Sequence, residues 1–331
     1  MPRFDALISR FASKRILVIG DLMLDEFVWG RVSRISPEAP VPVVEVVSES
    51  YYPGGAANVA RNVREFTEHT AVAGRIGADA RGVKLAGLLT AAGIDAAAVM
   101  READYPTSVK TRVIARNQQV VRVDRESKAP LTAGQTERAM RLLAAAIESA
   151  DAVIVADYGK GYLTQPLADS ICAKARERGA LLTVDPHPHT SLAWRGAAAI
   201  KPNRAEAFLA AGLAPSAPVD PPTADQVVLE AGKRLLARWE TGALLITLGE
   251  QGMLLFTGAA APYHTPARAK EVFDVSGAGD TAIAVFTLGL AAGASPVEAA
   301  ELANRASSIA VSKLGTATVT PAELRAACAG L

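Results

Sequence analysis

Cysteine and an excess charge of either sign are both scarce in this sequence. Only Cys172 and Cys328 occur among 331 residues, so neither a disulfide framework nor a cysteine-built zinc site is supported. The 35 Lys and Arg residues nearly balance the 34 Asp and Glu residues, which leaves a formal net charge of +1. That balance argues against bulk electrostatic binding to nucleic acid or to an anionic membrane.

Long apolar runs are also missing. The longest, residues 282–294, is interrupted by Thr287 and Gly289 and is shorter than the roughly 20 residues that span a bilayer. Residues 1–15 carry charges throughout and lack the apolar core of a signal peptide, so they predict a short amphipathic helix. A reducing cytoplasm is therefore the expected location.

Several common catalytic signatures are absent as well. The sequence contains no GxxxxGK[ST], no GxGxxG after a strand, no GxSxG and no HExxH. His187 and His189 flank Pro188, which prevents the helical spacing of a zinc-binding pair. A structural or substrate-adjacent role in a loop is favoured for these histidines over a metal site.

What the sequence does have is a regular alternation of short apolar runs and amphipathic stretches. Half of its residues are hydrophobic and 21% are charged, as in a folded globular protein. The alternation predicts a doubly wound α/β domain over residues 1–331, with a mainly parallel sheet between two layers of helices. The expected strands are 16–20, 152–156, 181–184 and 244–248, and the expected helices are 56–66, 135–148, 165–178, 224–239 and 296–311.

Two segments interrupt that alternation and predict a small β-sheet lid over the carboxyl edge of the main sheet. They are approximately residues 32–50 and 105–126. The second segment predicts a hairpin with its turn near Asn117 and Gln118. Its period-2 pattern places Lys110, Arg112 and Arg116 on one face.

The most informative motif is Gly277-Ala278-Gly279-Asp280, which opens a long apolar helix. Small residues let backbone N–H groups approach an anion at a helix N-terminus, where the dipole favours negative charge. Asp280 beside that anion could accept a hydroxyl proton as the hydroxyl attacks a γ-phosphoryl group. An ordinary helix start, with Asp280 complementing the dipole, is an equally good interpretation of these four residues alone.

A second glycine-rich motif lies upstream. Gly54 and Gly55 precede a helix that carries Asn58, and together they could receive a sugar hydroxyl. Taken alone, a tight turn with close helix packing is the better interpretation. Asp25 follows the first strand, where open α/β sheets bind ligands, and a solvated acid in a loop is the alternative interpretation.

The combination of these motifs, in this order, resembles the ribokinase-like (PfkB) carbohydrate kinases. The resemblance runs from residue 15 to about residue 321 and includes Lys201-Pro202-Asn203-Arg204-Ala205-Glu206 and Thr247-Leu248-Gly249-Glu250-Gln251-Gly252. In detail, residues 32–43 and 156–161 are similar to the heptose 7-phosphate kinase branch. The resemblance implies ATP-dependent phosphorylation of the anomeric C1 hydroxyl of D-glycero-β-D-manno-heptose 7-phosphate, on the route to ADP-heptose for lipopolysaccharide core.

The resemblance also implies a role for each matching residue. The proton acceptor would be Asp280, and the anion hole would be formed by Gly277, Ala278 and Gly279. Asn203 and Glu206 would organise Mg²⁺ and the ATP phosphates, with water between Glu206 and the metal, although the same pair also fits a helix capping box. The nucleotide would be lined by Thr247, Gly249, Gly252 and Asn304, the sugar by Asp25, Gly54, Gly55 and Asn58, and a monovalent cation such as K⁺ by Asp274.

A substrate that already carries a 7-phosphate needs cations at its far end, for which Lys110, Arg112, Arg116 and Lys160 are candidates. Solvated outer positions are the alternative for each of them. The apolar edge at 41–46 predicts a homodimer through the lid. Because no HxGH motif is present, adenylylation is expected from a separate protein. A kinase for another sugar and a non-catalytic sugar-binding relative are the alternative functions.

Overall fold

The computed structural model describes residues 2–116, 118–258, 260–269, 272–313 and 315–329, and its larger sheet runs in the order β13-β12-β11-β10-β9-β8-β1-β4-β5. Neighbouring strands are parallel except at β12, which is antiparallel to both β11 and β13. Their bounds are β1 Ile16–Gly20, β4 Thr70–Gly77, β5 Asp95–Glu102, β8 Ala152–Ala156, β9 Leu181–Asp185, β10 Ala199–Ile200, β11 Ala243–Thr247, β12 Met253–Phe256 and β13 Tyr263–Thr265.

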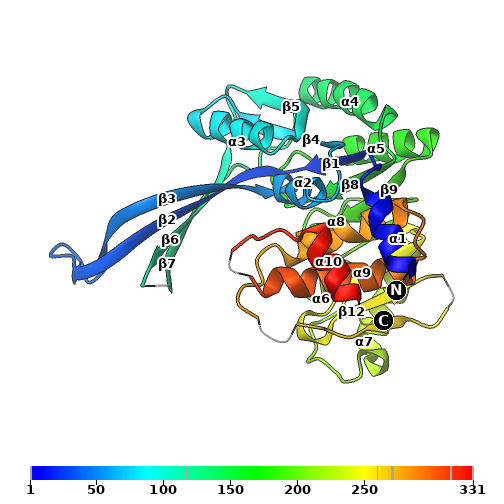
Figure 1. Cartoon of the computed structure of the whole chain (residues 1–331). Coiled ribbons are helices and arrows are strands. Elements are labelled where there is room, and N and C mark those ends of the chain that lie inside the picture. Colours follow the sequence, from blue (N-terminus) through cyan, green and yellow to red (C-terminus); the bar gives the residue numbers. More distant parts are fainter. Residues whose placement is uncertain (1, 117, 259, 270–271, 314, 330–331) are drawn as a thin grey trace.

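Helices cover both faces of this sheet (Figure 1). One face packs against α1 Pro2–Phe11, α2 Ala56–Arg64, α3 Ala80–Ala91, α8 Ala278–Ala291, α9 Pro296–Val311 and α10 Pro321–Cys328. The other packs against α4 Ala133–Glu148, α5 Gln165–Arg178, α6 Arg204–Ala211 and α7 Gln226–Trp239. The predicted doubly wound architecture is confirmed, as are the amphipathic N-terminal helix and the expected strands and helices to within two residues at most ends.

The largest boundary differences have local causes. Residues 222–224 form a 3₁₀ turn, and the Asp225 carboxylate accepts the N–H groups of Val227 and Val228, so α7 begins two residues later than expected. Helix α2 ends at Arg64 rather than at residue 66. No helix in the described part of the chain is long and apolar enough to cross a membrane.

The second sheet forms the predicted lid. It contains β2 Leu22–Ile35, β3 Pro42–Gly55, β6 Ser108–Ala115 and β7 Gln118–Arg125, in the order β3-β2-β6-β7. Figure 1 shows it as a long arm that projects from the carboxyl edge of the main sheet. The first insertion is longer than the expected 32–50, because β2 continues almost directly from β1. Asp25 therefore lies in a strand rather than in a loop.

The hairpin of β6 and β7 is confirmed, but the shared face predicted for its three cations is wrong at one position. Strand β6 ends at Ala115, and Arg116 lies beyond it with φ of 51°, so its side chain does not continue the alternation of the strand. Arg116 donates to the Val32 carbonyl. It lies about 20 Å farther along the arm than Lys110, at the rise of an extended strand. Asn117, expected in the turn, lies outside the described residues.

Candidate active site at the carboxyl edge of the sheet

Polar side chains follow neighbouring strands of the main sheet at the edge where the lid joins it. Asp21 comes directly after β1, Tyr158 lies two residues after β8, Asp185 ends β9, Lys201 follows β10 and Thr247 ends β11. These strands are adjacent in the order β11-β10-β9-β8-β1. Because parallel strands end at the same edge, residues far apart in sequence meet at one site, where ligands of open α/β sheets bind.

Asp280 lies at the centre of this site, in the first turn of α8. Gly277 precedes the helix with φ of 80°, a left-handed conformation that glycine adopts without strain, and no side chain caps the helix. Tyr158 Oη donates to Asp280 Oδ1 at 2.5 Å, and Asn58 Nδ2 donates to Asp280 Oδ2 at 2.6 Å. The structure thus brings the two predicted glycine-rich motifs together across the first turn of α8.

The electrostatic environment of Asp280 suits proton transfer near neutral pH. Desolvation raises the pKa of Asp280 to about 6, although the hydrogen bonds from Tyr158 and Asn58 oppose this shift. Lys201 Nζ pairs with Asp185 Oδ2 at 3.0 Å. Desolvation lowers the pKa of Lys201, but the Asp185 and Glu206 carboxylates outweigh it and leave that pKa raised. A buried cation is therefore held beside the first turn of α8.

A cavity of about 520 Å³ opens beside the same turn. It is more apolar than polar, and β11, its following turn, α8 and α9 all contribute to its walls. Asn304 is fixed in its wall by hydrogen bonds to Thr265 Oγ1 at 2.9 Å and to the Pro266 carbonyl at 2.7 Å. The lining includes four of the residues that were predicted for the nucleotide, together with part of the predicted anion hole: Thr247, Gly249, Gly252, Asn304, Ala278 and Gly279. Asn203 and Glu206, which were predicted for Mg²⁺ and the ATP phosphates, are not part of this lining.

Asn203 and Glu206 form the capping box that was the alternative to their phosphate role. Asn203 Oδ1 accepts the Glu206 N–H at 2.9 Å, and Glu206 Oε2 accepts the Asn203 N–H at 2.7 Å. Asn203 also forms an isolated bridge with Thr247 in the cavity wall. The capping contacts fix both side chains, and the Glu206 carboxylate lies close enough to Lys201 to raise the pKa of that ammonium, so the structural interpretation does not exclude the functional one.

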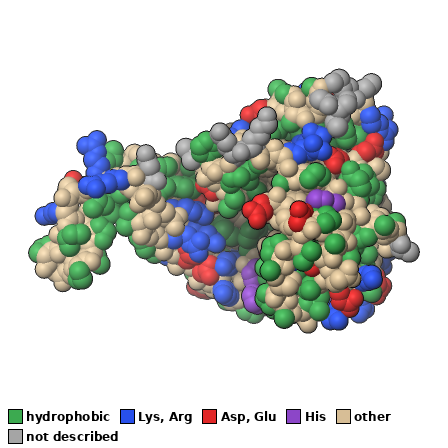
Figure 2. All heavy atoms as spheres, turned by 90° about the horizontal axis from the view of Figure 1, so that it is seen from below, with side chains coloured by type: hydrophobic (Ala, Val, Ile, Leu, Met, Phe, Trp, Pro, Cys, Tyr) green, Lys and Arg blue, Asp and Glu red, His purple; other side chains and the backbone are tan. Residues whose placement is uncertain are grey.

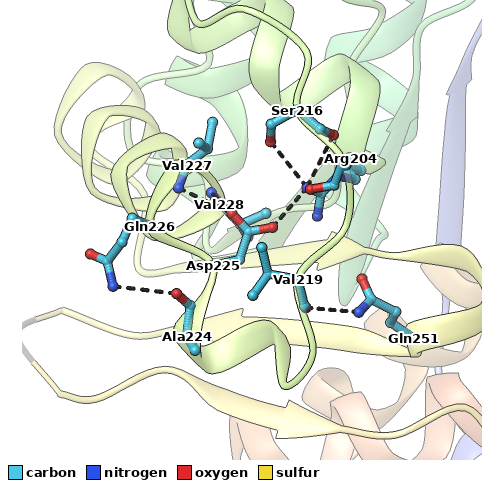
Figure 3. A network of polar contacts seen from close by, with 10 residues as sticks. Arg204, Ser216, Val219, Ala224, Asp225, Gln226, Val227, Val228 and Gln251 are labelled. Carbon is cyan, nitrogen blue, oxygen red and sulfur yellow. Dashed lines mark hydrogen bonds and ion pairs between the residues drawn. The ribbon is translucent and has the colours of Figure 1, made fainter.

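A polar network fixes the helix that carries this pair (Figure 3). Arg204, the first residue of α6, donates to Asp225 Oδ2 at 2.7 Å and to Ser216 Oγ at 3.2 Å. Gln251 donates to the Val219 carbonyl at 2.9 Å from the turn after β11. The network therefore ties the start of α6, the start of α7 and one edge of the cavity to a common loop.

The lid brings further side chains to this edge of the sheet, with Asp25 close enough to Tyr158 to raise the pKa of its hydroxyl. Asp25, Phe27, Lys110 and Arg112 occupy paired positions of β2 and β6 on one side of the sheet. Arg112 Nη1 lies 2.5 Å from Asp25 Oδ1, and both side chains are largely buried. A Cβ at Gly54 would lie 2.3 Å from Asp25 Oδ2, so glycine permits this close packing. The predicted sugar residues Asp25, Gly54, Gly55 and Asn58 thus line one region.

Further cations gather where the arm meets the body, and Figure 2 shows Lys and Arg side chains there. Lys160 Nζ pairs with Glu126 at 2.5 Å. Desolvation is the largest cause that lowers the pKa of Lys110, and the neighbouring Lys160 adds to it, which places the two ammonium groups close together. Lys110, Arg112 and Lys160 are therefore brought together, whereas Arg116 is not.

Two other sequence interpretations concern cations. Asp274 Oδ1 accepts the Ser276 N–H at 2.9 Å and Oδ2 accepts the Gly315 N–H at 3.2 Å, so this carboxylate organises the loop before α8. The rings of His187 and His189 lie 5.5 Å apart. In the described ranges no cluster of three or more His, Cys, Asp or Glu side chains is placed to hold a metal ion.

Sequence reasoning assigned no role to four residues of this site: Asp21, Tyr158, Asp185 and Lys201. Each follows or ends a buried apolar strand, and Tyr158 and Lys201 lie within motifs that the resemblance used. Listing every polar residue at the carboxyl end of a predicted parallel strand would have found them.

Comparison with known proteins decides the family. A model of the pfkB family of carbohydrate kinases matches residues 13–323. The chain belongs to this family. The predicted ribokinase-like carbohydrate kinase is thereby confirmed, and this pfkB-family chain is a phosphotransferase with an alcohol group as acceptor.

Relatives of this pfkB-family chain include proteins from Citrifermentans bemidjiense and Desulfatibacillum aliphaticivorans, each named bifunctional protein HldE. Each is 45% identical to it, over 97% and 96% of this chain. The chain spans 64% of the length of either relative. The relatives' name therefore describes proteins of which this chain matches only a part.

Solved structures agree on the fold. Escherichia coli phosphofructokinase-2 with substrates and products superposes with a TM-score of 0.76 at 21% identity, covering 96% of this chain and 99% of that one. Arabidopsis thaliana ribokinase with ribose and ATP gives a TM-score of 0.70 at 17% identity, covering 95% and 98%.

Proposed function

We propose that this protein transfers the γ-phosphoryl group of ATP to the anomeric C1 hydroxyl of D-glycero-β-D-manno-heptose 7-phosphate, giving heptose 1,7-bisphosphate for ADP-heptose synthesis. One observation carries the proposal: the buried Asp280 carboxylate lies at the same edge of the sheet as the face of the lid that is rich in cations. Similarity to HldE proteins supports the sugar class. The second activity implied by the word bifunctional is not attributed to this chain.

The reacting end of the site is built around Asp280. Its carboxylate accepts the proton of the C1 hydroxyl while the hydroxyl oxygen forms the new bond to the γ-phosphorus and the bond to the ADP oxygen breaks. The backbone N–H groups at Gly277, Ala278 and Gly279 stabilise the charge on the transferring group. Lys201 Nζ lies 3.5 Å from where a Cβ of Gly279 would be, so its ammonium also faces that group.

The nucleotide is proposed to occupy the cavity between β11 and α9, where the mainly apolar wall suits adenine. Mg²⁺ fits the donor set, because Mg²⁺ in phosphoryl-transfer sites takes one or two carboxylates together with phosphates and waters. Glu206 would hold it through water, with Asn203 beside the phosphates. When bound, Mg²⁺ neutralises phosphate charge. A dependence on K⁺ through Asp274 rests on family resemblance.

The far end of the sugar is proposed to lie under the lid. Lys110, Arg112 and Lys160 lie together there, and an anion such as the 7-phosphate would stabilise the Lys110 ammonium, whose pKa is lowered first by desolvation and then by Lys160. Asp25 would accept a sugar hydroxyl while Arg112 orients it. Closure of the arm over the sugar would exclude water and so limit hydrolysis of ATP.

The arm also supports a proposed homodimer. Strand β3 is an edge of the lid sheet, and several of its apolar side chains are exposed, including Val46 at 58% and Val47 at 61%. An exposed apolar edge strand favours pairing with another chain. A second copy, related by a two-fold axis, would cover both edges at once.

A cytoplasmic location, where ATP is available, belongs to the same proposal.

The test is an ADP-release assay with Mg-ATP and a panel of sugars: heptose 7-phosphate, heptose, fructose 6-phosphate and ribose. We expect kcat/KM for heptose 7-phosphate to exceed every other value by at least about a hundredfold, since a missing phosphate leaves buried cations unpaired. Preference for another sugar would assign a different kinase of the family. Saturable sugar binding without ADP would assign a non-catalytic relative.

A further inference from the structure

Asp21 makes an unusual set of contacts with the loop that carries Tyr158. Its carboxylate accepts the backbone N–H of Tyr158 at 2.9 Å and of Lys160 at 3.1 Å on Oδ2, and that of Tyr162 at 3.2 Å on Oδ1. Asp21 is only 3% exposed. One buried carboxylate from the end of β1 thus holds alternate N–H groups of the loop that follows β8.

The loop that Asp21 holds cannot be ordinary extended chain. Gly159 and Gly161 have φ of 66° and 85°, so the backbone turns back on itself twice between the three held N–H groups. The conformation of such a loop depends on the groups that satisfy its backbone N–H groups. Asp21 accepts three of them, and Asp157 Oδ1 accepts that of Gly159 at 2.8 Å.

The two ends of the site meet on this loop. The Tyr158 hydroxyl reaches Asp280 Oδ1, whereas the Lys160 ammonium reaches Glu126 beside the lid. Asp21 touches neither Asp280 nor the proposed position of the sugar in any contact of the described residues. Its effect on either would therefore pass through the loop.

We propose that Asp21 is a positioning residue, which holds Tyr158 against Asp280 and Lys160 against the lid and so aligns the two ends of the substrate site. The proposal rests on the proposed function, in which Asp280 accepts the proton. Without the Asp21 carboxylate the N–H groups of Tyr158, Lys160 and Tyr162 lose their acceptor, and the Tyr158 hydroxyl no longer donates steadily to Asp280.

A purely structural Asp21 would change stability and activity together, so the test needs a readout that reports on Asp280. The charged groups that face Asp280 are Tyr158 from the β8 loop, Asp185 from β9 and Lys201 from the β10 end, with Asp25 of the lid near Tyr158. Of these contacts, the Tyr158 hydrogen bond lowers the pKa of Asp280. Loss of the hydrogen bond from Tyr158 therefore raises the pKa of Asp280. The acid limb of the kcat/KM profile then moves toward higher pH.

The experiment compares Asp21→Asn, Tyr158→Phe and the double variant by pH profile on the full chain. Both single variants should lower kcat by on the order of tenfold to a hundredfold and should move the acid limb upward by on the order of 0.5 pH unit. The double variant should match Tyr158→Phe, because both changes remove the same contact. An unmoved limb in Asp21→Asn, or additive shifts, would overturn the proposal.

Asp79→Asn is the matched control. Asp79 accepts the N–H groups of Gly82 and Thr107 and so resembles Asp21 in its bonding, but it lies at the start of α3. The acid limb in the pH profile of the Asp79→Asn variant should stay at the wild-type pH. Hydrogen exchange at the Tyr158, Lys160 and Tyr162 amides should accelerate at least about tenfold in Asp21→Asn and not in Asp79→Asn. A wild type that phosphorylates no sugar would refute the proposed function instead.

Discussion

The Arg112 guanidinium and the Asp25 carboxylate form a largely buried ion pair on the inner face of the lid, 2.5 Å apart. The pair joins a residue expected to hold a sugar hydroxyl to one expected to hold the distal phosphate. Because the pair lies between β2 and β6, the proposed sugar and phosphate contacts both belong to the arm. If the site is divided between lid and body in this way, substitutions in the two parts should affect different substrates.

Arg112→Ala should raise the KM for heptose 7-phosphate by about tenfold or more, with KM for ATP changed less than about twofold. Removal of one partner of a buried charge pair costs on the order of 2–5 kcal/mol, and here it both unpairs Asp25 and removes a phosphate ligand. Steady-state kinetics measure both constants. Arg138→Ala, which breaks the exposed pair with Glu102, is the control. Equal increases for both substrates would contradict the assignment.

Asn304→Leu should show the opposite selectivity. The change removes the hydrogen bonds to Thr265 and Pro266 that shape the cavity wall, so KM for ATP should rise about tenfold while KM for the sugar stays near the wild-type value. Titration with a non-hydrolysable ATP analogue, followed by thermal shift, checks binding directly. Unchanged nucleotide affinity would remove Asn304 from the nucleotide site.

Activity should fall with acidity as Asp280 becomes protonated. Its pKa is raised from the ordinary aspartate value to about 6, so the reactive carboxylate predominates above that pH and is lost as the pH falls through it. Below pH 6 we expect kcat/KM to drop about tenfold per unit. Asp157, whose pKa desolvation also raises to about 6, is the control. An acid limb that disappears in Asp157→Asn would assign the titration to Asp157.

The proposed dimer depends on the exposed edge of the lid. Light scattering with size exclusion at micromolar concentration should show a dimer for the wild type and a monomer for Val46→Lys, because a charge on an edge strand opposes pairing. Val83→Lys introduces the same charge at an exposed valine of α3 and should remain dimeric. A monomeric wild type would refute the dimer.

Sequence patterns predicted the main sheet and the pfkB-family fold well, because buried strands are continuous apolar runs and the glycine-rich motifs stand at helix starts. The cavity residues were also predicted, through the family resemblance. The contacts of Asp280 with Tyr158 and of Asp25 with Arg112 could not be, since they depend on which strands are neighbours. The misplacement of Arg116 has a different cause: β6 ends at Ala115, and Arg116 adopts a left-handed turn conformation that the period-2 pattern does not reveal.

The most direct test of the proposed function is the identity of the product and its dependence on Asp280. Phosphorus NMR of a reaction with heptose 7-phosphate and Mg-ATP should show a new phosphate coupled to the anomeric proton, with the 7-phosphate retained. Asp280→Asn should lower kcat by about 10²-fold or more while it still binds the ATP analogue. A product phosphorylated elsewhere, or a fully active Asp280→Asn enzyme, would contradict the account.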